Sequence, residues 1–163
     1  MFIGDRVLLN IGFAAARARL GNLAGGGLLL RASEHAYGET IIGLADTAGS
    51  VASASQLAGV RPADITETPG MAKLPVYWEA TTGAGTLFPA LDADITLTPV
   101  GDQTTVLALT GVFRPPPGLA DAGLDQEIVS WFAAAALRVF LARLAAALVH
   151  PSGAAPESLA KLA

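Results

Sequence analysis

The sequence predicts an α+β fold in which an antiparallel sheet of about six strands wraps around one long C-terminal helix. In the second half of the 163-residue chain, the segments 73–82, 89–99 and 104–114 have strand character. They lead through the proline-rich turn 114–118 into one long apolar segment that ends near residue 150. A half-buried sheet and an apolar helix both need cover, so the two should pack against each other.

Length and composition limit the class of protein. The 163 residues suit one domain, which we place at 1–150, followed by a loosely ordered tail at 151–163. Hydrophobic residues make up 52% of the chain and charged residues 15%, against about 25% charged residues in typical domains. So little charge predicts that a cavity ligand or a second subunit covers some apolar surface. The net charge of -4 comes without a dense basic patch, which argues against a nucleic-acid partner.

Simple counts exclude several kinds of site. The chain has no cysteine, so disulfides, thiolate catalysis and cysteine-based zinc sites are ruled out. His35 and His150 are too few and too far apart for a metal cluster, and no cofactor is expected. The first residues lack the pattern of a signal peptide, which predicts a cytoplasmic protein. Residues 131–149 resemble a membrane span, but Arg138 and Arg143 interrupt it, so we expect a buried helix instead of membrane insertion.

The first part of the chain is predicted to form one strand and two short helices. Residues 2–11 are rich in Ile, Val and Leu and form the first strand, which ends at a glycine. Residues 14–23 favour a helix, and residues 28–37 favour a second one closed by Gly38.

The segment 40–70 carries weaker strand signals. Residues 40–45 and 51–60 are strand candidates diluted by Ala, Ser and Gly, which have low strand propensity. Residues 61–70 contain two prolines and are predicted to be an edge strand or a loop. Pro69 and Gly70 should form a turn into the next strand.

The strands after this turn show alternation with a period of two. In the strand at 89–99, Asp92 and Asp94 point to one face and the aliphatic residues between them point to the other. The strand at 104–114 is apolar on both faces, so we expect cover on both sides. The inward residues predicted by alternation in the first two of these strands are Leu74, Val76, Trp78, Ala80, Leu91, Ala93, Ile95 and Leu97.

The C-terminal helix is predicted to begin near Leu119, or at Asp121 as its N-cap, and to end near His150, because Pro151 disfavours helical geometry in the residue before it. It is apolar nearly all round. One side can face the sheet and a cavity, and the other must face the short helices or a second copy of the chain. The first side carries Leu124, Ile128, Trp131, Val139 and Val149, and the other carries Leu137, Phe140, Leu144 and Leu148.

This order of elements resembles the helix-grip fold of the START-related (SRPBCC) superfamily, which includes Bet v 1-like and polyketide cyclase-like proteins. The resemblance covers roughly residues 1–150. Within it, the segments 74–81, 87–94 and 111–116 are similar to an uncharacterised actinobacterial branch, to which the resemblance attaches no chemistry. The superfamily resemblance implies a cavity between the sheet and the last helix for a lipid, polyketide, sterol or other apolar molecule, in carriers, cyclases or regulatory subunits.

Residues with acid or base chemistry are weighed against simpler roles. Asp92 and Asp94 share one face of a strand, as paired acid and base catalysis would need, but the Thr residues on that face favour a solvated outer surface. Glu79 should point away from the interior because it alternates with Trp78. His35 and Tyr37 lie where these folds open their cavity, and a helix end is the competing explanation for the histidine. No catalytic residue is predicted.

The sequence therefore predicts binding or carriage of an apolar small molecule between the sheet and the helix at 119–150. Arg114 could clamp an anionic group of the ligand, or tie the sheet to a nearby acid. The alternatives are a cyclase-like or hydrolase-like enzyme that uses the same cavity, and a non-catalytic homodimeric interaction module with a filled core. The predicted ligand-binding residues are Trp78, Leu91, Ala93, Ile95, Phe113, Ile128, Trp131, Phe132 and Val139, with Tyr37 and Arg114 as polar groups that orient the ligand.

Overall fold

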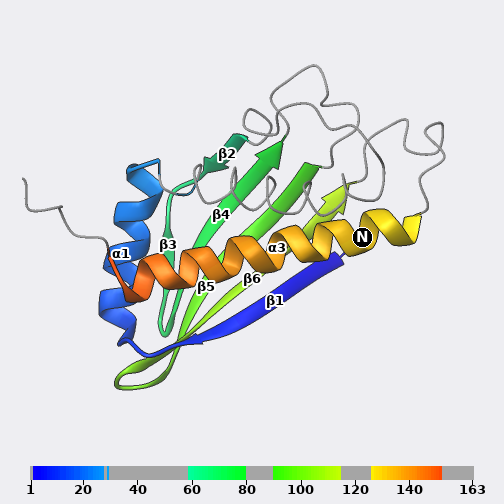
Figure 1. Ribbon diagram of the computed structural model, residues 1–163. Coiled ribbons are helices and arrows are strands. Elements are labelled where there is room, and N and C mark those ends of the chain that lie inside the picture. The colour runs from blue at the N-terminus through cyan, green and yellow to red at the C-terminus, as the bar shows by residue number, and fades with distance from the viewer. Residues whose placement is uncertain (1, 28, 30–58, 80–89, 115–125, 152–163) are drawn as a thin grey trace, which may run out of the picture.

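A computed structural model describes residues 2–27, 29, 59–79, 90–114 and 126–151, and in them a curved antiparallel sheet is crossed on one face by a long helix (Figure 1). This is the predicted α+β helix-grip architecture, and the prediction of about six strands is confirmed. In chain order the elements are β1 (Phe2–Leu9), α1 (Phe13–Gly25), β2 (Gly59–Pro62), β3 (Thr66–Thr68), β4 (Met71–Glu79), β5 (Ala90–Gly101), β6 (Thr104–Arg114) and α3 (Gln126–Val149).

The strand order places the N-terminal strand beside the last one. The sheet runs β1-β6-β5-β4-β2, and β3 pairs with another part of β4. Every pairing is antiparallel. The two short strands β2 and β3 share one edge of β4, and between them the N–H of Ala63 donates to the carbonyl oxygen of Pro75 at 2.9 Å. The segment 61–70 is therefore an edge, as one of its two predictions stated, and it is divided into two short strands.

Most predicted elements that fall within the described residues match the structure closely. The predicted strands at 2–11, 73–82 and 89–99 correspond to β1, β4 and β5 with ends shifted by a few residues, and β6 has the predicted bounds. Gly70 has a φ of 76°, which suits the residue after proline in a tight turn between β3 and β4. Apart from Leu29, which is helical, the helix at 28–37 lies outside the described residues. Also outside the described residues are the predicted strand at 40–45, most of the predicted strand at 51–60, the start of the C-terminal helix at 119–125, and the tail after residue 151.

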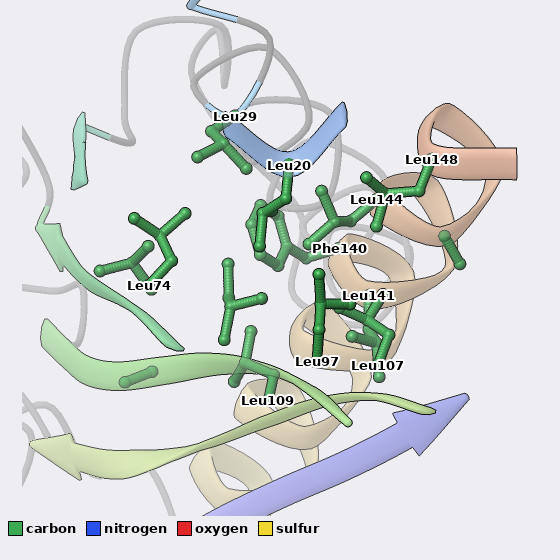
Figure 2. Packing of buried hydrophobic residues seen from close by; sticks show 14 of the residues in the cluster. Leu20, Leu29, Leu74, Leu97, Leu107, Leu109, Phe140, Leu141, Leu144 and Leu148 are labelled. Atoms are coloured by element: carbon green, nitrogen blue, oxygen red, sulfur yellow. The ribbon is translucent and has the colours of Figure 1, made fainter. Parts of the chain in front are cut away.

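The core lies between the inner face of the sheet and the two helices (Figure 2). The sheet contributes alternate residues of β4, β5 and β6, and α1 contributes Leu20. Phe140 of α3 and Leu20 of α1 belong to the same buried cluster. The buried side of α3 consists of Ala133, Ala136, Leu137, Phe140, Leu141, Leu144, Ala145 and Leu148.

The prediction that β6 is covered on both faces is only partly right. Its inner residues Leu107, Leu109 and Phe113 are buried. On the outer face Val106 is half-buried, whereas Val112 is 48% exposed. The outer face of β6 is therefore partly open to solvent, because α1 and α3 both pack on the other side of the sheet.

A glycine allows β5 and β6 to come close together where the sheet curves. Gly111 lies directly opposite Ala93, and both residues belong to the buried face of the sheet. A Cβ at Gly111 would overlap the carbonyl oxygen of Asp92 and lie 2.7 Å from the Cβ of Ala93. Glycine in a strand often marks such a close approach of backbones.

Two polar contacts stabilise one end of the molecule. This end lies opposite the one where β4 ends at Glu79 and β6 ends at Arg114. Arg19 of α1 donates to the carbonyl oxygens of Leu148 and Val149 at 2.7 and 3.3 Å, which are among the carbonyls left unpaired at the C-terminus of α3. The hydroxyl of Thr105, a fully buried residue, donates to a backbone carbonyl in the segment between β1 and α1 at 2.9 Å.

As predicted for a helix stopped by Pro151, α3 ends at Val149. No helix in the described part of the chain is long and apolar enough to cross a membrane.

Candidate functional site

The candidate site is the inner face of the sheet where β4 and β6 end and β5 begins. Leu91 and Phe113 lie opposite each other in the β5–β6 pair, and the next inward pair is Ala93 and Gly111. All four residues are buried. These strand ends therefore provide an apolar surface with two large side chains and, beside them, a pair of positions with almost no side-chain bulk.

The described buried residues of α3 become smaller from its C-terminus toward its N-terminus. Toward its C-terminus, the buried positions carry Phe140, Leu141, Leu144 and Leu148, which pack with the leucines of the sheet (Figure 2). Toward its N-terminus, the buried positions among the described side chains are Ala133 and Ala136. The N-terminal half of α3 runs beside the start of β1 and hence near the end of β6, since Asp5 contacts Arg138 and Phe2 pairs with Val112. The described buried side chains of α3 are thus smaller at this end.

Four predicted ligand-binding residues have the predicted orientation. Leu91, Ala93, Ile95 and Phe113 are buried on the inner face, and Ile95 lies deepest, with no exposed surface. Val139 is partly buried and packs against the core. Whether these residues contact a ligand stays a prediction.

Two predicted ligand-binding residues are positioned differently from the prediction. Trp131 was expected to face inward, but 63% of its surface is exposed. The α3 helix turns the side with Phe140 and Leu144 toward the sheet, because those large residues form a continuous stripe with a helical repeat. Arg114 forms an ion pair with Asp92 on the outer face of the sheet. It ties the sheet to a nearby acid, which was the second of its two predicted roles.

The remaining predicted ligand-binding residues cannot be placed from the described part of the chain. Tyr37 lies in a segment outside it, as does His35. Trp78, Ile128 and Phe132 belong to described elements, but their side chains are not described. Their roles stay predictions.

Asp92 and Asp94 lie on the outer face, as predicted from the residues that alternate with them. Asp92 pairs with Arg114, and Asp94 pairs with Lys73 at 2.7 Å. All four side chains of these pairs keep more than a third of their surface exposed. The two carboxylates therefore belong to solvated ion pairs and are separated from the interior by the sheet.

One acid faces inward, and sequence reasoning did not single it out. Asp5 of β1 lies opposite Leu109, a buried residue of β6, so it shares the inner face. One carboxylate oxygen accepts the backbone N–H of Arg6 at 2.8 Å, and the other lies 3.6 Å from Nε of Arg138. Both oxygens of Asp5 thus have partners at the edge of the sheet. The alternation of Ile3, Asp5 and Val7 was the signal that could have shown its direction.

A shallow hollow of about 380 Å³ lies on the opposite, outer face of the sheet. Phe2, Thr110 and Val112 line one part of it, Pro75 and Tyr77 line another, and Asp92 and Asp94 of β5 lie between them. It is a different surface from the candidate site, because it lies on the far side of β5 and β6 from both helices.

Comparisons with known proteins find similarity of structure only. No protein-family model matches the sequence, and no curated protein matches it. A conserved protein from Geobacillus kaustophilus has a TM-score of 0.55 at 16% identity, over 91% of this chain and 95% of that chain. A hypothetical protein from Helicobacter pylori has a TM-score of 0.50 at 9% identity, over 90% and 86%. A norcoclaurine synthase point mutant from Thalictrum flavum has a TM-score of 0.41 at 10% identity, over 87% and 94%.

The shared property is the fold. The first two structures follow this chain over nearly its whole length, which supports the helix-grip arrangement of sheet and C-terminal helix. At such low identity a common fold does not carry a common function. Membership of the START-related superfamily and the resemblance to its actinobacterial branch stay predictions.

Proposed function

We propose that this protein binds or carries a neutral, apolar small molecule between the ends of β4, β5 and β6 and the N-terminal half of α3. The observation that carries the proposal is a group of small residues among the described positions of this interface. Ala93 and Gly111 lie beside Leu91 and Phe113 on the sheet, and Ala133 and Ala136 lie on α3, whereas leucines and Phe140 fill the other end. A ligand there would complete the apolar packing that the large side chains provide elsewhere.

The chemistry of the described inner face favours an uncharged ligand. Thr105 is its buried polar residue, and its hydroxyl is already bonded to a backbone carbonyl at the other end of the sheet. Asp5 is held by two partners at the sheet edge. A charged group placed among the described residues of the candidate site would lose its hydration without gaining a partner, which is costly. Binding through shape and apolar contact is therefore the favoured mode.

Catalysis is the weaker proposal. A cyclase-like or hydrolase-like enzyme needs an ionisable group directed into the cavity, and the acids Asp92 and Asp94 point to the outer face. His35, Tyr37 and Glu79 remain the candidates for such a role. Among the described residues, no group of three or more histidines and acids is arranged to hold a metal ion.

Two alanine substitutions on α3 test where the ligand lies. Ala133 and Ala145 are both buried, with 5% and 8% of their surface exposed, but they lie at opposite ends of the interface. If there is space for a ligand beside Ala133, we expect Ala133→Leu to fold with nearly unchanged stability and to weaken binding of an apolar fluorescent probe. Ala145→Leu should instead lower the free energy of unfolding by about 1–3 kcal/mol, as overpacking of a filled core does.

The readouts are the midpoint of urea unfolding, probe titration, and native mass spectrometry of the purified protein for a co-purified ligand. Ala18→Leu is the matched control, because Ala18 is exposed on α1. Equal destabilisation by Ala133→Leu and Ala145→Leu, together with no probe binding by the native chain, would show that the core is filled and would refute the proposal.

A further inference from the structure

The strand β1 forms the long free edge of the described sheet. In the described part of the chain its one strand neighbour is β6, and it stands at the end of the order β1-β6-β5-β4-β2. The opposite edge is formed by short pieces, because β2 and β3 have four and three residues. By contrast, β1 runs over eight residues and carries Phe2, Ile3 and Val7, whose residue types favour strands. A long apolar edge of this kind is where a strand of another chain can add to a sheet.

Alternate residues of β1 direct their backbone groups toward this free edge. In an antiparallel pair, one residue turns its N–H and C=O toward the partner strand, and the next turns them away. The N–H of Arg6 donates to Oδ1 of Asp5 at 2.8 Å, so it points away from β6. By the same alternation, Gly4 and Leu8 also turn their backbone groups to the free edge. A strand that added to β1 would therefore pair with Arg6 in the middle of this row.

Asp5 closes the middle of the row. Its side chain lies on the inner face, since Asp5 is opposite the buried Leu109. One carboxylate oxygen accepts the Arg6 N–H, and the other lies 3.6 Å from Nε of Arg138, so the carboxylate lies between β1 and α3 at the free edge. The Asp5 side chain keeps 38% of its surface exposed to water. A strand that added here would displace the carboxylate from the N–H and remove its water, and both steps cost free energy.

We propose that Asp5 keeps the free edge of β1 unpaired, because it covers the Arg6 N–H and places a hydrated charge where an added strand would lie. Inward-pointing charges on edge strands prevent such pairing in other sheets. The neighbouring inner residues Ile3 and Val7 are aliphatic, and an aliphatic residue at position 5 would suit the strand better than an acid. The pair with Arg138 stabilises the fold little, since the arginine side chain is 75% exposed. Protection of the edge therefore explains the acid better than folding stability does.

Sedimentation velocity over a concentration series tests the role of Asp5. We expect Asp5→Val to stay folded and to raise the association constant at least about tenfold above that of the native chain. The matched control is Asp94→Val. Asp94 has a nearly equal exposed fraction, 37%, and also pairs with a cation, Lys73, but it lies in β5, which has a strand on each side. The control should associate no more than the native chain. Equal association of the two variants, or no increase with Asp5→Val, overturns the proposal.

A second substitution tests whether the association uses the edge of β1. Proline lacks the N–H, and edge strands tolerate it where that N–H faces away from the sheet. Adding Arg6→Pro to Asp5→Val should therefore remove the extra association, whereas adding Arg6→Ala should keep it. If thermal unfolding shows that the proline variant does not fold, Val7→Lys takes its place, because it restores an inward charge to the strand. Association that persists in the folded double variant occurs through another surface and overturns the proposal.

Discussion

Removal of Arg19 is expected to destabilise the protein by breaking the contact that joins α1 to the end of α3. The guanidinium is partly buried and donates to the carbonyl oxygens of Leu148 and Val149 at 2.7 and 3.3 Å. These carbonyls have no partner within the helix, and a cation at a helix C-terminus also interacts favourably with the helix dipole. In Arg19→Met the aliphatic stem keeps its packing and only the charged donor is lost.

The expected loss is about 1.5–3 kcal/mol. This is the range for hydrogen bonds that involve a charged group, and it includes the favourable interaction with the helix dipole. For a chain of this size, each kcal/mol lowers the melting temperature by about 2–4 °C, so Arg19→Met should melt about 3–12 °C below the native chain. Circular dichroism followed during heating and during urea titration measures both quantities.

Arg17 on the same helix supplies the matched control. It pairs with Glu67 of β3 at 2.6 Å, but both side chains are about half exposed. Such a surface ion pair contributes about 0–1 kcal/mol, so Arg17→Met should change stability little. Arg19→Lys keeps the charge without the planar guanidinium and should lie between Arg19→Met and the native chain. If Arg19→Met and Arg17→Met have the same small effect, Arg19 does not stabilise the end of α3.

Three further substitutions test the sheet. Gly111→Ala should destabilise by about 1–3 kcal/mol, because its Cβ would overlap the neighbouring strand, whereas a Cβ at Gly101 in the same hairpin would lie 3.9 Å from Thr104, an ordinary contact, so Gly101→Ala should cost less; equal midpoints of urea unfolding would contradict the close approach. Thr105→Val should cost about 1–2 kcal/mol, since it leaves a backbone carbonyl without its 2.9 Å donor, and a stability equal to that of the native chain would show that water replaces the hydroxyl. Asp92→Asn should change the melting temperature very little, because the pair with Arg114 is exposed; a large loss would mean that this pair fixes the end of the sheet.

The strands could be predicted from the sequence because one face of the sheet is buried and the other is not. In β5 the polar residues Asp92, Asp94 and Thr96 alternate with aliphatic residues. This pattern indicates both the strand and which of its faces is buried. The close approach at Gly111 was missed, since one glycine in a strand gives no information about its neighbour. A tie between Arg114 and an acid was one of its two predicted roles, but Asp92 was not named as the partner, because the sequence does not show which residues of β5 and β6 lie opposite each other.

The orientation of α3 could not be decided by counting apolar residues, since both of its sides carry them. The side that packs inward has Leu137, Phe140, Leu144 and Leu148 at regular intervals of three or four residues, which gives a continuous stripe of large side chains. The other side has Trp131, with alanines after it. Weighting each position by the area it can bury, at about 25 cal/mol per Å², would not have decided between the sides either, because Trp131 gives the outward side a large apolar area.

The same weighting changes what the high hydrophobic content means. A share of 52% hydrophobic residues suggested that much apolar surface must be covered, but alanine contributes to this share while exposing little apolar area. Ala142 and Ala146 are exposed on α3 and give little drive toward association by themselves. The hydrophobic share of 52% therefore overstates the apolar area that a ligand or a second copy would have to cover.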